Sequence, residues 1–437
     1  MFLKQSYTNH VQVLQEKTAA ILQELKLDAL VIGAGSPVVY FEDDQAMPFR
    51  ANHHFRHWCP FPGTDHLLII VPGHKPRLRI YQPADFWHEV KLLEPDFWTD
   101  AFTIETAADE ETLWKDLPRG SRIAYHGPDL VRASEKGLLV QVEGLLPRLN
   151  WSRLTKTLYE QQSLTEATKV AAMGHKAAER AFRQGGSELD VHLAYLNATR
   201  STEHDLPYET IVALNEKAAF LHYGAKRDDV HNGRVLLIDA GAQVRGFAAD
   251  ITRTYATDEA PEEFRSLLEG MQKLQFELCQ EIQPGLRMND LHVRAHQKIA
   301  QLLISHRILL NCDEQKAMQA GLTMAFFPHG LGHQLGLLVH DVAGRQVDVR
   351  GTLGETDPRF PRLRTTRPLN PGTYVTIEPG IYFIKMLLDP FRNSEHSSCF
   401  QWSLIERLMP CGGIRIEDNV LVLEDRVRNI TREFLPL

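Results

Sequence analysis

The sequence has few cysteines and no paired cysteine motif. Its five cysteines are Cys59, Cys279, Cys312, Cys399 and Cys411. An odd, scattered set without a CxxC pair argues against a disulfide framework. It predicts reduced thiols, mostly buried and inert, in a cytoplasmic protein.

Long hydrophobic runs and excess positive charge are also lacking. The first residues, MFLKQSYTNHVQVLQEK, contain no apolar stretch of signal-peptide length, and no later run approaches the ~18 apolar residues of a membrane span. With 48 Lys and Arg against 56 Asp and Glu, the formal net charge is -8. We therefore expect neither a membrane nor nucleic acid as a partner.

The 437 residues have an ordinary globular composition and predict two or three domains. A helix with Leu14, Ile21 and Leu22 on one face is followed by apolar strands near 28–32, 66–71, 77–81 and 121–125. This alternation predicts an α/β domain over residues 1–158. The Gly33-Ala-Gly35 sequence lacks a third glycine, so we do not interpret it as a dinucleotide site.

Residues 159–437 form the second expected domain, which opens with helices. Ser163-Leu-Thr-Glu166 has the spacing of a capping box before a helix over 167–182, and Ser187 with Asp190 has it before the next. Further helices are expected near 264–280 and 290–304, followed by strands and loops. The loops 344–370 and 385–410 are long and charged, and each is either a lid or a solvated loop.

Two aspartates follow one another closely in the middle of the chain. An apolar strand ends at Asp239, turns through Gly241 to Gly246, and returns past Asp250. A hairpin would place the two carboxylates on neighbouring strands, ~5 Å apart, where they repel unless a cation neutralises them. The alternative is that each aspartate only opens a turn.

Histidines and glutamates supply the other candidate ligands. His329 and His333 have i, i+4 spacing, but Gly330 and Gly332 between them favour a bent strand or loop over a helix, and His340 follows shortly. Glu378 ends a β-branched strand before Pro-Gly.

In the last segment, Arg415 and Glu417 alternate with Ile414 and Ile416. A surface ion pair is the simple interpretation of Arg415 and Glu417, although their apolar neighbours favour burial. Four carboxylates and one imidazole suit two divalent ions such as Mn²⁺, Co²⁺, Fe²⁺ or Zn²⁺.

Taken in order, the motifs IDAG…ADITRTY, FFPHGLGH, VHD, TIEPG and GGIRIED resemble those of the pita-bread metallopeptidases. The chain is most similar to the bacterial Xaa-Pro dipeptidases (prolidases) and to their relatives, the organophosphorus acid anhydrolases. FEDD at 41–44 and ADFWH at 84–88 extend the likeness into the first domain. The resemblance implies a creatinase-like α/β N-terminal domain and an α+β pita-bread catalytic domain.

The resemblance also implies roles for individual residues. Two ions, with Mn²⁺ the first choice, would be bound by Asp239, Asp250, His333, Glu378 and Glu417, and a hydroxide bridging them would attack the peptide bond. Glu378, His329 and His340 would be catalytic, with Glu378 as the proton shuttle. The residues implied to bind substrate are His222, Arg415 (for the C-terminal carboxylate), Tyr208, Leu363, Asp44 and Trp87.

These implications favour a cytoplasmic, homodimeric dipeptidase acting on small peptides with C-terminal proline, with a side activity on organophosphate triesters. Asp44 and Trp87 would act across the dimer. An Xaa-Pro aminopeptidase for longer peptides remains an alternative, and a non-catalytic binding module is disfavoured by retention of all five ligands. His53, His54 and His57 are expected at a surface or interface. His292 and His296, spaced i, i+4, leave open a second metal site.

Overall fold

The computed structural model describes residues 2–118 and 120–436. The chain forms two compact units, one of Met1–Gln161 with Asp348–Thr352 and the other of Gln162–Val347 with Leu353–Leu437. The units therefore join between residues 161 and 162, whereas the sequence placed the boundary after residue 158. The short segment from the long loop 344–370 that returns to the first unit was not anticipated.

The first unit is built on a five-stranded mixed sheet of order β4-β3-β2-β1-β5. Strands β1–β5 and β3–β4 pair in parallel, whereas β1–β2 and β2–β3 are antiparallel. Every residue of β1 is buried, which explains its uninterrupted apolar sequence. The elements are α1 (Phe2–Glu24), β1 (Ala29–Gly33), α2 (His53–Trp58), β2 (Leu67–Ile70), β3 (Arg77–Tyr81), β4 (Thr103–Ala107), α3 (Glu110–Leu113), β5 (Ile123–His126), α4 (Leu130–Glu135) and α5 (Leu145–Ser152).

The second unit combines long helices with several small antiparallel sheets, ordered β10-β7-β6, β11-β14-β15, β12-β13 and β8-β9. Its helices are α6 (Leu158–Arg183), α7 (Glu188–Thr199), α8 (Glu262–Gln280), α9 (Met288–Ser305), α10 (Glu314–Gln319), α11 (Lys385–Arg392), α12 (Trp402–Leu408) and α13 (Ile430–Phe434). Its strands are β6 (Ile211–Leu214), β7 (Val235–Asp239), β8 (Gln243–Val244), β9 (Phe247–Ala248), β10 (Thr252–Ala256), β11 (Tyr374–Ile377), β12 (Gly380–Tyr382), β13 (Gly413–Arg415), β14 (Asp418–Val422) and β15 (Val427–Asn429).

Strand β7 is buried on both faces, and this holds its C-terminal end in place. Leu236 and Ile238 pack in one cluster with Phe182 of α6 and Val191 of α7. Leu237 points the other way, into a cluster with Tyr382 of β12. Because alternate side chains leave opposite faces of a strand, the strand is fixed from both sides.

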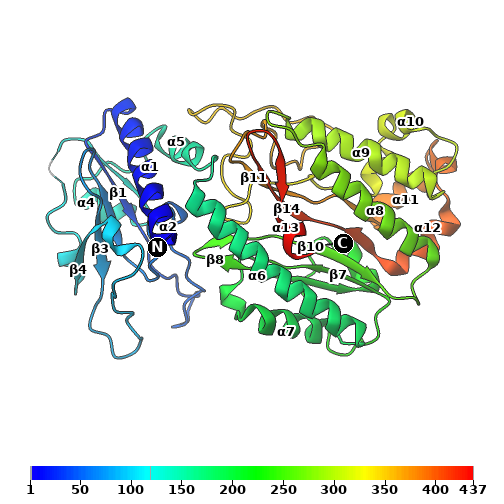
Figure 1. Cartoon of the computed structure of the whole chain (residues 1–437), viewed down its shortest axis with the longest axis horizontal. Coiled ribbons are helices and arrows are strands. Elements are labelled where there is room, and N and C mark those ends of the chain that lie inside the picture. Colours follow the sequence, from blue (N-terminus) through cyan, green and yellow to red (C-terminus); the bar gives the residue numbers. More distant parts are fainter. Residues whose placement is uncertain (1, 119, 437) are drawn as a thin grey trace. The chain divides into compact units, whose positions relative to one another are not determined.

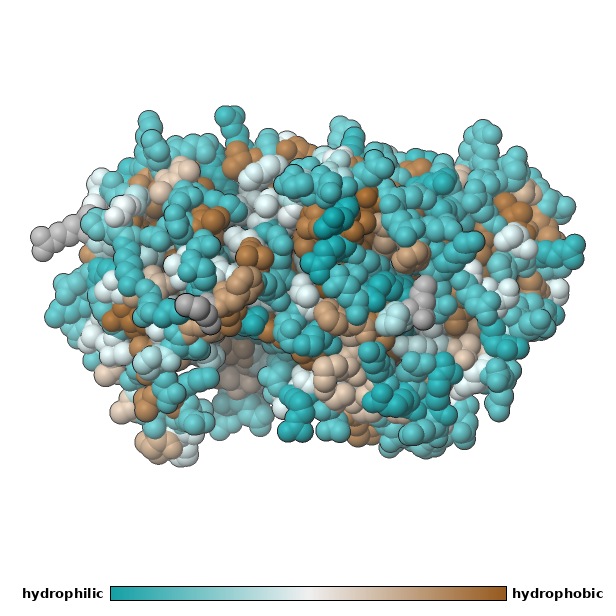
Figure 2. Space-filling model, viewed as in Figure 1, coloured by the Kyte–Doolittle hydropathy of each residue, from teal (hydrophilic) through white to brown (hydrophobic). Residues whose placement is uncertain are grey.

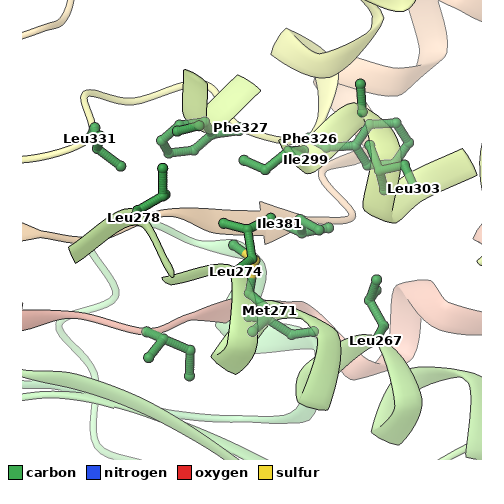
Figure 3. Close-up of a cluster of buried hydrophobic side chains, with 14 of the residues drawn as sticks. Leu267, Met271, Leu274, Leu278, Ile299, Leu303, Phe326, Phe327, Leu331 and Ile381 are labelled. Atoms are coloured by element: carbon green, nitrogen blue, oxygen red, sulfur yellow. The ribbon is translucent and has the colours of Figure 1, made fainter. Parts of the chain in front are cut away.

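Helices α8 and α9 lie side by side and enclose the largest apolar cluster (Figure 1). Leu267 and Leu274 of α8 and Ile299 of α9 gather around Phe326 and Ile381 (Figure 3). Each fully buried aliphatic side chain of this kind contributes roughly 1.5–3 kcal/mol, so this packing anchors the segments that lead to residues 327–333 and to β12.

Helix α6 begins earlier than its sequence pattern suggested. Thr157 caps it, since the Thr157 backbone N–H donates to Glu160 Oε2 at 2.7 Å and its hydroxyl accepts from the Glu160 N–H at 3.4 Å. Ser163, expected to be the cap, is buried inside the helix. The capping box of Ser187 with Asp190 is formed as predicted.

The face of the molecule shown in Figure 2 carries mainly hydrophilic side chains, with hydrophobic ones in scattered patches. Within residues 2–118 and 120–436, no helix combines the length and the apolar character needed to cross a bilayer. The loop 385–410 is more ordered than expected, because it contains α11 and α12.

Candidate metal centre

The five predicted metal ligands line one cavity of about 400 Å³ in the second unit. They come from distant parts of the sequence: the end of β7, the approach to β10, the glycine-rich segment 329–333, the end of β11 and the link between β13 and β14. The set is Asp239, Asp250, His333, Glu378 and Glu417.

The two aspartates were expected on neighbouring strands of a hairpin, but only Asp239 lies on a strand of the antiparallel pair β7–β10. Asp239 pairs with Thr252, and Asp250 lies two residues before the start of β10. The connection is tight at Gly241, where a Cβ atom would lie 2.1 Å from the carbonyl oxygen of Ala249. Only glycine fits there, so the turn that brings the two carboxylates together depends on this residue.

Tyr208 holds the aspartates together. Its hydroxyl lies 2.8 Å from Asp239 Oδ1 and 2.5 Å from Asp250 Oδ1, so its single proton is shared between them. The sequence resemblance gave Tyr208 only a role in the substrate pocket. The hydrogen bonds indicate a second role, which is to orient two candidate metal ligands.

His333 is held with one ring nitrogen directed at the carboxylates. The carbonyl of Gln334 can only accept, so the Nδ1–H donates to it at 3.0 Å. This tautomer leaves the Nε2 lone pair facing Asp250 Oδ2 at 3.4 Å and Glu378 Oε1 at 3.5 Å. A neutral imidazole fixed through its other nitrogen is the usual form of a metal-binding histidine.

Gly332 allows His333 to approach strand β11 closely. A Cβ at this position would lie 2.0 Å from the carbonyl oxygen of Thr376, and the next backbone carbonyl, of His333, accepts from the Thr376 N–H at 3.0 Å. The segment is therefore extended and glycine-bent rather than helical, as its sequence predicted.

The two glutamates complete the set of acidic side chains that line the cavity. Glu378 follows β11 directly, and Glu417 accepts from the Thr252 hydroxyl at 2.6 Å. One ligand atom each from Asp250, His333 and Glu417 lies within 4.8 Å of the other two. Ligands of one ion with metal–ligand distances of ~2.0–2.2 Å lie at most about 4.4 Å apart, so these side chains would need to close only slightly around an ion.

The electrostatics of these carboxylates favour bound cations. Burial and the neighbouring carboxylates raise the pKa of Asp239 and of Glu417, and raise that of Glu378 to about 7. Burial opposes ionisation of Asp250 as well, but without a cation a protonated His333 and the Tyr208 hydroxyl both donate to it, outweigh the burial and lower the pKa. A bound cation would take the place of the proton on His333 Nε2. Four acidic groups around one cavity, two of them buried and two partly buried, cannot all ionise without countercharge, which divalent cations would supply. The donor set therefore fits a two-metal site.

Arg415 lies beside this centre and is not at the surface. Its Nη2 donates to Asp239 Oδ2 at 2.6 Å, its Nε to Thr252 Oγ1 at 3.1 Å and its Nη1 to Tyr382 Oη at 2.9 Å. The Tyr382 hydroxyl in turn lies 2.9 Å from His329 Nε2. Sequence reasoning missed Tyr382, although its position two residues after TIEPG was a usable signal.

The remaining predicted residues lie in three places: the same cavity, the neighbouring cavity and the surface of the first unit. His222, His329 and His340 line the same cavity, and Leu363 lines a neighbouring one. Two arginines of the long loop 344–370, Arg362 and Arg364, also line the cavity and were missed, because nothing in their local sequence distinguishes them from other charged loop residues.

Asp44 and Trp87 belong to the first unit and are exposed there.

The other histidines have structural surroundings. His57, expected at a surface or interface, is buried; its Nε2 lies 3.1 Å from Glu160 Oε1, and His10 lies close to both. Lys17 and Lys156 contribute positive charge at this cluster, which disfavours a cation. His54 is also buried.

His292 and His296 pack against the rings of Phe327 and Phe360. Neither belongs to a group of three or more metal-binding side chains among the described residues.

Comparison with known proteins agrees with this geometry. Residues 162–424 match metallopeptidase family M24, and residues 5–151 match the N-terminal domain of Xaa-Pro dipeptidase. Proteins named Xaa-Pro dipeptidase from Serratia proteamaculans, Pectobacterium atrosepticum and Escherichia coli are each 42% identical to the chain over 98% of both sequences.

Solved structures support the same fold. A variant of Escherichia coli aminopeptidase P and the proline aminopeptidase P II of Yersinia pestis each superpose with a TM-score of 0.73 at 22% identity. The match covers 99% of this chain and 95% and 96% of theirs. This confirms the expected fold class of an N-terminal α/β domain followed by a pita-bread domain. The chain therefore belongs to metallopeptidase family M24, within its group of Xaa-Pro dipeptidases.

Proposed function

We propose that this protein hydrolyses Xaa-Pro dipeptides in a metal-dependent reaction. The observation that carries the proposal is the convergence of Asp239, Asp250, His333, Glu378 and Glu417 on one cavity. The full-length similarity to proteins named Xaa-Pro dipeptidase gives the substrate class.

The same five residues would hold two divalent cations, and we infer Mn²⁺ as the native metal because oxygen ligands predominate. When bound, such a pair acidifies a water molecule and polarises the scissile carbonyl. The protein contributes a buried, preoriented ligand set whose geometry is fixed by Tyr208, Thr252 and the Gln334 carbonyl.

Glu378 would move the proton. Its carboxylate faces the cavity beside His333, where it can take a proton from the attacking water and pass it to the proline nitrogen as the bond breaks. His222, His329 and His340 lie around the same space and would contact the peptide and the tetrahedral intermediate.

The proline carboxylate needs a cationic partner. Three donors of Arg415 already bind Asp239, Tyr382 and Thr252. Among the described residues, no hydrogen bond or ion pair engages the side chains of Arg362 and Arg364. We therefore assign these two arginines the first contact with the carboxylate, with Arg415 as a secondary contact.

The proposal is tested by comparing Ala-Pro with Ala-Pro-Ala as substrates in the presence of Mn²⁺. We expect Ala-Pro to have the higher kcat/KM and a strong chelator to abolish its turnover until metal is returned. Preference for the tripeptide would favour an Xaa-Pro aminopeptidase, and full activity in chelator would overturn the metal mechanism.

We also propose a side activity on phosphotriesters, because water activated by a bound metal pair would be able to attack phosphorus as well as carbon. Hydrolysis of paraoxon by the Mn²⁺ form, lost in chelator, is the expected result. No release of nitrophenol above the metal-free blank would exclude this activity.

We further propose a cytoplasmic homodimer. All five cysteines are free thiols, which suits a reducing compartment. Large apolar side chains are exposed on two loops of the first unit, among them Phe41 (90%), Phe86 (87%) and Trp87 (79%). Exposed groups of this kind mark interaction surfaces, and Asp44 and Trp87 on these loops would then contribute to the cavity of the second copy.

A further inference from the structure

Helix α6 packs against the connection between Asp239 and Asp250. Small side chains on one face of the helix and on the connection gather in a single buried cluster, with Ala167, Ala171 and Ala172 on the helix and Ala242, Ala249 and Ile251 on the connection. Because alanine side chains are short, the two backbones approach closely in such a cluster. The helix therefore lies directly against the segment that carries two of the candidate metal ligands.

One side chain of α6, His175, reaches the backbone of this connection. Its Nε2 lies 3.0 Å from the carbonyl oxygen of Ala240, which can only accept, so Nε2 carries the proton and donates. The same ring also makes a polar contact with the backbone of Ile251. Ala240 is the residue after Asp239 in the chain, and Ile251 is the residue after Asp250. One imidazole therefore holds both arms of the connection beside the two aspartates.

The rest of the His175 ring destabilises the fold. The side chain is fully buried, and burial lowers its pKa to about 3, so the ring is neutral. With the proton on Nε2, the other nitrogen is an acceptor, yet within residues 2–118 and 120–436 no donor reaches Nδ1. An apolar side chain would fill the same space without a buried, unpaired acceptor. The donor on Nε2 is therefore the property that distinguishes histidine at this position.

A second polar link joins α6 to the same connection. The side-chain amide of Asn419 donates from Nδ2 to Thr168 Oγ1 at 3.2 Å, and its Oδ1 accepts from the backbone N–H of Asp250 at 3.4 Å. Thr168 lies about two helical turns before His175, so both side chains leave the same face of α6. This face thus supplies both the apolar packing and the polar contacts that hold the backbone beside the aspartates.

We propose that His175 is a positioning residue of the metal centre, because the hydrogen bond from its Nε2–H to the Ala240 carbonyl fixes the backbone that carries Asp239 and so sets the affinity for divalent cations. The inference rests on the proposed metal-dependent function. Outer hydrogen bonds that orient metal ligands change metal affinity by about 10–100-fold. His175 acts through the backbone and not through a ligand side chain, so we expect the lower end of this range.

Two substitutions separate the hydrogen bond from the space that the ring fills. His175→Met keeps a similar volume without a donor, and should weaken Mn²⁺ binding about tenfold in calorimetric titrations of the full chain. In His175→Gln the amide nitrogen is as many bonds from Cβ as Nε2 is, so its N–H restores the donor and the affinity should stay within about threefold of the unsubstituted protein. Unchanged affinity in the Met variant, or equal weakening in both variants, would overturn the inference.

His66 in the first unit provides the matched control. It too is a buried histidine whose Nε2 lies near a backbone carbonyl oxygen, that of Pro62, at 3.3 Å. His66→Met should lower the melting temperature, because it removes a buried hydrogen bond, but should leave the Mn²⁺ affinity unchanged. A similar loss of affinity in His66→Met and His175→Met would show that the affinity follows overall stability, and would contradict the role of His175.

Turnover distinguishes this inference from the proposed function. At saturating Mn²⁺ the His175→Met protein should cleave Ala-Pro with a kcat within about threefold of the unsubstituted protein, because bound ions then hold the ligands in place. A larger loss of kcat at saturation would contradict a role confined to metal affinity. Mn²⁺ binding by the unsubstituted protein without cleavage of Ala-Pro would count against the dipeptidase function alone, and absence of Mn²⁺ binding would overturn both.

Discussion

Glu378 is the single side chain whose chemistry is hardest to replace. Its Oε1 lies 3.5 Å from His333 Nε2, and its other oxygen lies 3.7 Å from His329 Nδ1. We predict that Glu378→Gln lowers kcat for Ala-Pro by about a thousandfold, because an amide cannot accept the proton that the reaction releases. Thermal unfolding should change little, since the amide has the size of the acid. A kcat within tenfold of the unsubstituted protein would exclude the proton-shuttle role.

Two tyrosines near Asp239 and Asp250 allow a matched comparison of metal affinity at the residue scale. Tyr208 binds both Asp239 and Asp250, whereas the buried hydroxyl of Tyr195 has no hydrogen-bond partner among the described residues. Tyr208→Phe should weaken Mn²⁺ binding about tenfold, because loss of an outer hydrogen bond frees the ligands to rotate. Tyr195→Phe should leave the affinity unchanged. Titration calorimetry measures both, and equal effects would show that the hydroxyl of Tyr208 has no orienting role.

At the scale of elements, the bend at 329–333 determines whether His333 reaches the candidate metal centre. A Cβ at Gly332 would meet the Thr376 carbonyl at 2.0 Å, but at Gly330 the nearest backbone atom would be 3.2 Å away. Gly332→Ala should therefore lower both the melting temperature and the Mn²⁺ content, and Gly330→Ala should do so much less. Mass spectrometry of bound metal and calorimetry check the pair. Similar losses in the two variants would argue that the close approach to β11 is unimportant.

A buried histidine network joins α1, α2 and α6 and predicts a pH dependence. Burial lowers the pKa of His57 to about 4 and also lowers that of His10. Burial opposes ionisation of Glu160, but the charge and hydrogen bond of His57 outweigh it and hold the pKa well below its usual range. Below pH ~6.5 these histidines bind protons in the unfolded chain but not in the folded one. The free energy of unfolding is therefore greatest above that pH and falls as the pH drops towards 4.

For His57 alone the loss is about 2 kcal/mol at pH 5 relative to pH 7.5. Glu160 adds to it only below its unfolded pKa of ~4.3, because a lowered acid pKa stabilises the fold above that value. Urea unfolding followed at the two pH values should show the loss, and His57→Asn should reduce this pH dependence. A midpoint that does not move between pH 7.5 and 5 would contradict the buried, neutral state of these histidines.

At the scale of the whole molecule, the proposed homodimer can be tested by mass. Light scattering after size exclusion should give twice the 49.8 kDa of the chain. Phe41→Glu with Phe86→Glu should shift the protein towards the monomer, since charges at exposed apolar positions oppose their burial. Leu193→Glu, at a half-exposed position of α7 in the other unit, is the matched control and should remain dimeric. A monomeric unsubstituted protein would refute the dimer and the contribution of Trp87 to a second copy.

The candidate metal ligands could be named from sequence because each stands in a short local pattern. Asp239 ends an apolar strand, His333 follows two glycines, and Glu378 precedes Pro-Gly. The start of α6 could not be predicted from sequence, because Thr157-x-x-Glu160 and Ser163-x-x-Glu166 have the same spacing. Only the packing of the helix selects between them, and it buries Ser163.

The sequence by itself determined the two-domain order, the candidate metal-ligand set and the glycine-bent histidine segment, since all of these depend on residue type and short spacing. Tertiary structure alone decided the register that pairs Asp239 with Thr252, the bridge made by Tyr208, and the chain from Arg415 through Tyr382 to His329. It also decided that a larger, mainly apolar cavity adjoins the metal centre. These features join residues far apart in the chain, and contacts of that kind are set by how buried faces pack rather than by local pattern.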